Sequence, residues 1–179
     1  MDSLLTRHQL VAHWAPGALF IGALLPLFYD LSWSQTMNSL SQHPTVSLSA
    51  FAIAAFLLGE ILDSTRDLAE QLLDLVYKRF NCNLLKKLVK KVYWDFFAEA
   101  KGEQLDNLEN YYFVYYVFNI NSFLALFITA SIFWISGQLH ELPPVIKYIG
   151  IIFGLVLFFD GFFLRNEIAN ITNTFAKKK

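Results

Sequence analysis

The sequence is poor in charged residues and has a single cysteine. Charged residues make up 16% of its 179 residues, against about 25% in a typical soluble domain. The lone Cys82 excludes an intrachain disulfide. The chain has no HExxH, Glu-x-x-His, P-loop or Gly-x-Ser-x-Gly motif and no nucleic-acid-binding motif. These absences argue against an enzyme, a metal site, a bound cofactor or a nucleic-acid partner.

Hydrophobic residues are abundant instead, and they gather in long runs. They make up 55% of the chain, and aromatic residues make up 17%. A helix needs about 20 apolar residues to cross the hydrocarbon core, and backbone groups in lipid must be hydrogen-bonded within the protein. The sequence therefore predicts an all-α, polytopic membrane protein with four transmembrane helices, near residues 10–29, 46–62, 112–136 and 143–164.

The basic residues predict how these spans are oriented. The connections 30–45 and 137–144 contain no lysine or arginine, whereas 63–110 contains eight and the C-terminal end is also basic. Basic residues accumulate on the cytoplasmic side of a membrane. We therefore expect a multi-pass protein of the plasma or inner membrane with both termini in the cytoplasm.

This orientation divides the chain into membrane and cytoplasmic parts. We expect one continuous helix from about 46 to 80, because no glycine or proline follows Gly59 there, and a second helix over about 83–101. The predicted parts are transmembrane helices one and two in 1–62, a cytoplasmic helical hairpin in 63–110, transmembrane helices three and four in 111–165, and a cytoplasmic tail in 166–179.

Charged residues on the predicted hairpin follow helical spacing. The stretch "GEILDSTRDLAE" opens a line of acids at steps of three and four, comprising Glu60, Asp63, Asp67, Glu70 and Asp74. This line is either a solvated face or a surface paired with lysines. The second helix carries four lysines on one side, which would contact lipid headgroups, a partner or the acidic line. They are Lys86, Lys87, Lys90 and Lys91.

The predicted topology also brings polar side chains from four helices to one depth. Ionisable residues at membrane depth usually face a bundle interior or water. The candidates for a pore lining or a polar network are His13, Glu60, Asp63, Arg66, Asp67, Asn119, Asn121, Asp160 and Arg165. We expect Arg165 to pair with Glu60 or Asp160, and Asp63 to pair with Arg66 or Arg165.

Three interpretations of these polar residues stay open. They form a structural network, a water-filled vestibule of a solute pathway, or a catalytic or metal site. In the second interpretation, Glu60, Asp63 and Asp67 line the inner mouth of the pathway and attract cations.

The stretches "YYFVYYVFNINSFLALF" and "DGFFLRNEIANIT", together with "GEILDSTRDLAE", complete a whole-chain layout. This layout resembles that of small four-span prokaryotic membrane effector proteins associated with anti-phage defence systems. The resemblance implies an oligomer that perturbs the membrane when a cytoplasmic signal, such as a nucleotide, acts on it.

The sequence as a whole leads to a ranked set of functions. The first is a homo-oligomeric membrane pore or membrane-perturbing effector, gated by a cytoplasmic signal, whose partners are the lipid bilayer and copies of itself. The alternative is a non-conducting membrane anchor or assembly subunit that docks a cytoplasmic partner protein. A membrane-embedded enzyme comes third.

Overall fold

The computed structural model describes residues 9–29, 41–42, 44–79, 90–100, 102–137 and 144–177. These residues form helices and connections without strands, which confirms the all-α prediction for this part of the chain. Three long helices dominate: α4 (Pro44–Arg79), α8 (Val114–Ile135) and α9 (Pro144–Ala176). The shorter elements are η1 (Gln9–Trp14), α2 (Ala15–Tyr29), α6 (Phe96–Glu99), α7 (Glu103–Leu108) and η2 (Glu109–Phe113).

Three helical stretches are long and apolar enough to cross a membrane. They are Ser47–Val76, Val114–Ile135 and Pro144–Ala176. These helices support a multi-pass membrane protein. The apolar run in η1 and α2, Val11–Leu24, is shorter, so the fourth span stays a prediction.

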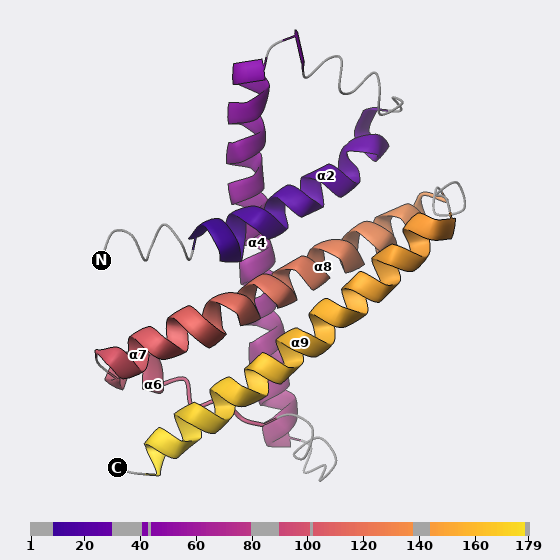
Figure 1. Cartoon of the computed structure of the whole chain (residues 1–179). Coiled ribbons are helices and arrows are strands. Elements are labelled where there is room, and N and C mark those ends of the chain that lie inside the picture. Colours follow the sequence, from indigo (N-terminus) through magenta and orange to yellow (C-terminus); the bar gives the residue numbers. More distant parts are fainter. Residues whose placement is uncertain are drawn as a thin grey trace.

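The long helices do not form a parallel bundle. Figure 1 shows α8 and α9 running antiparallel and side by side, with α4 crossing them at a steep angle. The helix α2 packs on both α4 and α8. Helix α4 therefore meets the other helices along only part of its length, and its two ends extend past them (Figure 1).

The crossing of η1 and α2 over α4 depends on two glycines. A Cβ atom added to Gly17 would lie 1.8 Å from the Ala55 carbonyl oxygen, and one added to Gly59 would lie 2.1 Å from the His13 carbonyl oxygen. Both distances are far inside van der Waals contact. The absence of a side chain at Gly17 and Gly59 therefore lets the two helix backbones touch.

Helix α4 is continuous, as the sequence predicts. Its 36 residues reach about 54 Å at ~1.5 Å per residue, well beyond the ~30 Å of hydrocarbon. The hydroxyl groups of Ser64 and Thr65 donate to the carbonyl oxygens of Glu60 and Ile61, four residues back. These polar residues are therefore satisfied within the helix and do not end it.

The predicted second helix is wrong for the part that the structure describes. Residues 90–95 are not helical, and only the four-residue α6 follows them. Side chains of α9 hold the backbone of this segment: Asn166 accepts from the Lys90 amide (3.1 Å), and Asn173 donates to the Lys91 carbonyl (2.7 Å). The segment is therefore extended along α9. Cys82, Lys86 and Lys87 lie outside the described residues.

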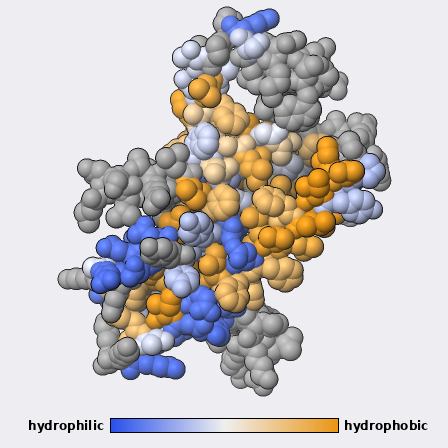
Figure 2. All heavy atoms as spheres, viewed as in Figure 1, coloured by the Kyte–Doolittle hydropathy of each residue, from blue (hydrophilic) through white to orange (hydrophobic). Residues whose placement is uncertain are grey.

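The C-terminal part also differs from the expected division. Helix α9 does not end near Arg165 but continues to Ala176, so most of the predicted tail is helical. This lower half of α9 packs on a core that includes Phe96 and Phe175, whose rings meet edge to face at 5.0 Å. Figure 2 shows hydrophilic residues around this end and hydrophobic residues over the upper part of α8 and α9.

A candidate polar site along α4

Two acids of the line on α4 face other helices: Asp63 contacts α8, and Glu70 contacts both α8 and α9. Arg66 is 5% exposed and Glu70 is 9% exposed, whereas the side chain of Asp67 is 58% exposed. The interpretation as a solvated face is therefore wrong for Asp63 and Glu70, whose side chains are 20% and 11% exposed, and it holds for Asp67. The same spacing that makes a line on the helix places these residues against two other helices.

At the upper end of the line, Glu60 contacts η1. The His13 Nδ1 lies 3.3 Å from Glu60 Oε1. His13 is almost fully buried, whereas the side chain of Glu60 is 47% exposed. The predicted pair of Glu60 with Arg165 is wrong, because Arg165 is bonded to Glu70, ten residues further along α4.

The next group is centred on Arg66, which is buried between two acids of its own helix. Its guanidinium lies 2.6 Å from both Asp63 and Asp67, which confirms the predicted pair of Asp63 with Arg66. The guanidinium also lies over two aromatic rings of the neighbouring helix, at 5.9 Å from Phe113 and 5.8 Å from Tyr116. These contacts compensate for the burial of the Arg66 charge.

Asn121 ties this group to the N-terminal helix. Its Nδ2 donates to Asp63 Oδ1 and to the Ala12 carbonyl oxygen, both at 3.1 Å. Asn121 itself is fully buried. The predicted polar residue Asn121 therefore connects η1, α4 and α8 through hydrogen bonds.

Glu70 is the most connected acid of the site. Arg165 Nε lies 2.8 Å from Oε1 and 3.0 Å from Oε2, and Arg165 Nη2 lies 2.8 Å from Oε2. The Tyr116 hydroxyl also donates to Oε1. Arg165 Nη1 donates to the Lys90 carbonyl oxygen at 2.7 Å. A charge-assisted bidentate pair thus joins α4, α8, α9 and the extended segment.

Sequence reasoning found Arg165 but not its partners. In the sequence, Glu70 is one of five acids at helical spacing, and Tyr116 is one of several neighbouring aromatic residues. The signal that could have selected Glu70 is its position four residues after Arg66 on the same face. The depth of Arg165 relative to α4 depends on the crossing angle, which the sequence does not encode locally.

Asp160 and Asn119 form a separate pair on α8 and α9. Asn119 Nδ2 donates to Asp160 Oδ2 at 2.6 Å. The predicted pair of Asp160 with Arg165 is wrong: five residues on a helix rotate a side chain by about 140°, so the two residues occupy different faces. Arg165 is buried, and Asp160 is exposed on the outer face.

Lys90 contacts α9 rather than the acidic line. Its Nζ donates to Asn170 Oδ1 at 2.7 Å. The side chains of Asn166 and Asn173 also form hydrogen bonds with the backbone of this segment, and together with the Lys90 contact they hold it on α9. Sequence reasoning missed these asparagines, although their spacing along α9 is helical.

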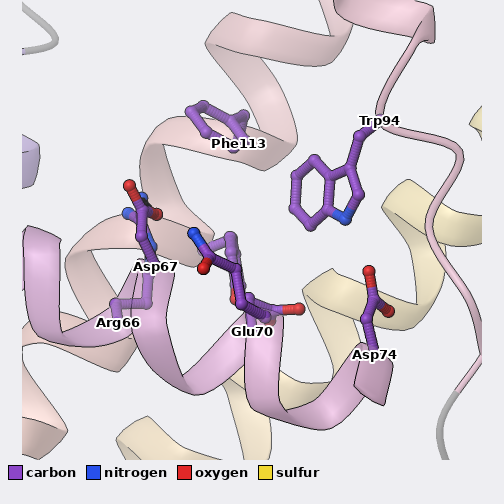
Figure 3. A pocket seen from close by; sticks show the side chains of 8 residues that line it. Arg66, Asp67, Glu70, Asp74, Trp94 and Phe113 are labelled. Carbon is purple, nitrogen blue, oxygen red and sulfur yellow. Dashed lines mark hydrogen bonds and ion pairs between the residues drawn. The ribbon is translucent and has the colours of Figure 1, made fainter. Parts of the chain in front are cut away.

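A half-open cavity lies beside Glu70 at the lower part of the acidic line. Its volume is about 250 Å³, and it is lined by Arg66, Asp67, Glu70, Gln71, Asp74, Trp94, Phe113 and Tyr116. Figure 3 shows the Asp74 carboxylate pointing towards the Trp94 indole, with Phe113 on the opposite wall. A neighbouring hollow of about 480 Å³ shares Arg66, Asp67, Trp94 and Phe113 with it.

Within the described ranges, no group of three or more His, Cys, Asp or Glu side chains has the geometry to hold a metal ion. Comparisons with family models, curated proteins and solved structures find no match for this chain. The resemblance to anti-phage membrane effectors therefore stays a prediction.

Proposed function

We propose that the chain is a four-span membrane protein that assembles with copies of itself into a pore or a membrane-perturbing effector. The observation that supports this proposal is the outward position of Asp160. Its carboxylate lies on the exposed face of α9, inside a helix that is apolar enough to cross a membrane. Ionisable residues in such helices almost always face protein or water, because lipid cannot satisfy them.

The surroundings of Asp160 have the form of a helix-packing surface. Ile152, Leu155, Val156, Phe159 and Phe163 line a surface hollow of about 500 Å³ together with Asp160. Counted from Ile152, these residues lie at positions i, i+3, i+4, i+7, i+8 and i+11, so they form one stripe of α9. The stripe is exposed in one chain, with Ile152 at 61% and Phe159 at 63%. We name residues 152–163 of this face the α9 stripe.

A second copy of the chain fits the α9 stripe better than lipid does. Lipid tails would cover the apolar residues equally well, but they offer no hydrogen bond to Asp160. In a ring of copies, each Asp160 with its partner Asn119 would face the space between subunits. Carboxylate rings of this kind select cations in channels.

The interior of a single chain offers less room for a path. Asp63 binds the buried Arg66, and Glu70 binds the buried Arg165 and accepts a hydrogen bond from Tyr116, so these side chains occupy the interior of the chain. We therefore do not propose that Asp63 lines a pathway. The path is proposed between subunits, with Asp160 as its lining residue.

The test is electrical. Purified protein in a planar bilayer should give discrete currents that favour cations, and Asp160→Asn should reduce this preference because it removes the charge and keeps the shape. Asp106→Asn is the matched control, since Asp106 is exposed on α7. A folded oligomer without current under any condition would remove the pore, and equal selectivity of all three forms would remove Asp160 from the lining.

A second candidate is the membrane anchor that docks another protein. It is favoured by an apolar strip on the lower half of α4, where Leu68, Leu72 and Leu75 are 61%, 60% and 60% exposed. Exposed apolar surface of this kind often marks an interaction site. An anchor would show no current, and Leu72→Asp would abolish partner binding without affecting the assembly of the membrane helices.

A further inference from the structure

The lining of the cavity beside Glu70 carries more negative than positive side chains. It contains three carboxylates and one guanidinium group. Glu70 is neutralised by Arg165, and Arg66 is shared between Asp63 and Asp67. Asp74 is half-buried and has no hydrogen bond or ion pair to a residue that the structure describes. Asp74 therefore faces the cavity without a cation in direct contact among the described residues, and only Arg165, which Glu70 already binds, attracts it from further away.

The walls of the cavity are aromatic. Trp94 and Phe113 lie on opposite sides of it, and the Asp74 carboxylate points towards the Trp94 ring (Figure 3). Aromatic faces attract cations, and tryptophan attracts them most strongly. The ring of Tyr116 also lines the cavity and already faces the Arg66 cation. The lining thus combines aromatic faces with an unpaired carboxylate, which is the chemistry that recognises organic ammonium groups.

Size and depth narrow the ligand further. A volume of about 250 Å³ is below the ~300 Å³ at which pockets for drug-sized ligands begin, so the cavity fits a small group. Asp67 lies five residues beyond Leu62, where the apolar run ends, which is about 8 Å along the helix. Lipid headgroups occupy a layer roughly 5–8 Å thick on each side of the hydrocarbon. In the predicted topology, the Asp67 end of the cavity therefore lies at headgroup depth, and Asp74 lies about 10 Å further along α4.

We infer that this cavity binds an alkylammonium group, carried by a lipid headgroup such as ethanolamine or by a small soluble amine. The ammonium group would lie against the Trp94 ring, away from the Arg66 cation over Phe113, with Asp74 as its counter-ion. This site is independent of the proposed pore, because it uses neither Asp160 nor the α9 stripe.

The test uses Trp94 as a reporter in full-length protein that carries Trp14→Phe, Trp33→Phe and Trp134→Phe. Titration with ethanolammonium chloride should change the Trp94 fluorescence saturably, whereas equal sodium chloride should not. Asp74→Asn should weaken binding about tenfold, as expected when a charge-assisted contact is lost. Asp106→Asn should bind as the parent does.

Bilayer discs separate the two sources of the amine. If the ligand is a headgroup, discs with phosphatidylethanolamine should change the fluorescence relative to phosphatidylglycerol discs and block added ethanolammonium. If the ligand is soluble, both discs should give the same titration. Because Asp74 makes no hydrogen bond or ion pair within the described residues and attracts Arg165 only from a distance, Asp74→Asn should melt close to the parent, which separates lost binding from lost folding. Absence of a saturable change in both arms, or binding unaffected by Asp74→Asn, would overturn the site.

Discussion

At the scale of single residues, the strongest contact between the membrane helices is the Glu70–Arg165 pair. Both residues are buried, with 5% of the Arg165 side chain and 11% of the Glu70 side chain exposed, and the pair has bidentate geometry. Arg165→Ala leaves Glu70 and Tyr116 without their cation, so we expect it to lower the free energy of unfolding by roughly 3–5 kcal/mol. Lys177→Ala is the control, since Lys177 is exposed on the turn after α9. Denaturation in mixed micelles measures both.

The replacement of both partners distinguishes a buried pair from a local packing defect. The double variant Glu70→Met/Arg165→Met should be more stable than either single variant, because no charge is left buried alone. Equal stability of Arg165→Ala and Lys177→Ala, or purely additive losses in the double variant, would contradict the account of this pair.

Glu109 gives a pH-dependent prediction at the same scale. Partial burial raises the pKa of Glu109 above the 4.5 that is usual for a glutamate, and the nearby Asp106 raises it further. The folded state therefore binds the proton more tightly than the unfolded state, so this residue's contribution to stability falls as pH rises from 4.5 through the raised pKa. Glu109→Gln should flatten the stability profile in that window, as thermal melts would show. A profile identical to that of the parent would contradict the shift.

The ion pair that the sequence predicted correctly joins two residues of one helix. Asp63 and Arg66 are three positions apart on one helix, so their pairing follows from helical spacing. Glu70 and Arg165 are 95 residues apart, and which acid meets Arg165 depends on how α4 crosses α9. Membrane-depth arguments alone placed Arg165 opposite Glu60, ten residues away from the acid that binds it.

At the scale of elements, helix continuity was predictable and helix absence was not. Helix α4 has no strong breaker after Gly59, and it runs to Arg79. The local sequence of 90–95 also predicts a helix. In the structure, however, the side chains of Asn166, Thr172 and Asn173 on α9 form hydrogen bonds with the backbone of this stretch. Those bonds compete with the helical ones, and a local pattern does not include them.

The crossing of α2 over α4 gives the prediction at this scale. Gly59→Ala adds a methyl group 2.1 Å from the His13 carbonyl oxygen, so the helices must separate, and we expect a loss of about 1–3 kcal/mol or more. Gly22→Ala is the matched control, because a Cβ there meets no atom within 4 Å. Removal of a mid-helix glycine should even stabilise α2, by up to ~1 kcal/mol. Equal unfolding of the two variants would contradict the close crossing.

At the scale of the whole molecule, the sequence predicted the helical membrane class from its apolar runs. The spans and their orientation are testable by labelling. On a Cys82→Ser background, Ser136→Cys should react with a membrane-impermeant thiol reagent in intact cells, because it lies at the outer end of α8 in the predicted topology. Asn107→Cys, beyond the other end of α8, should react only after permeabilisation. In the parent protein, native Cys82 should likewise react only after permeabilisation. Reaction of both Ser136→Cys and Asn107→Cys in intact cells would contradict the topology.

The central claim is that the α9 stripe with Asp160 faces another copy of the chain. The most direct measurement is oxidative cross-linking in native membranes on the Cys82→Ser background. Ile152→Cys lies on the stripe and Ile151→Cys beside it, and the parent residues are almost equally exposed, at 61% and 59%. We predict covalent dimers for Ile152→Cys and few for Ile151→Cys, because only the stripe turns towards the neighbouring α9. Equal yields at both positions, or no dimers at either, would contradict the claim.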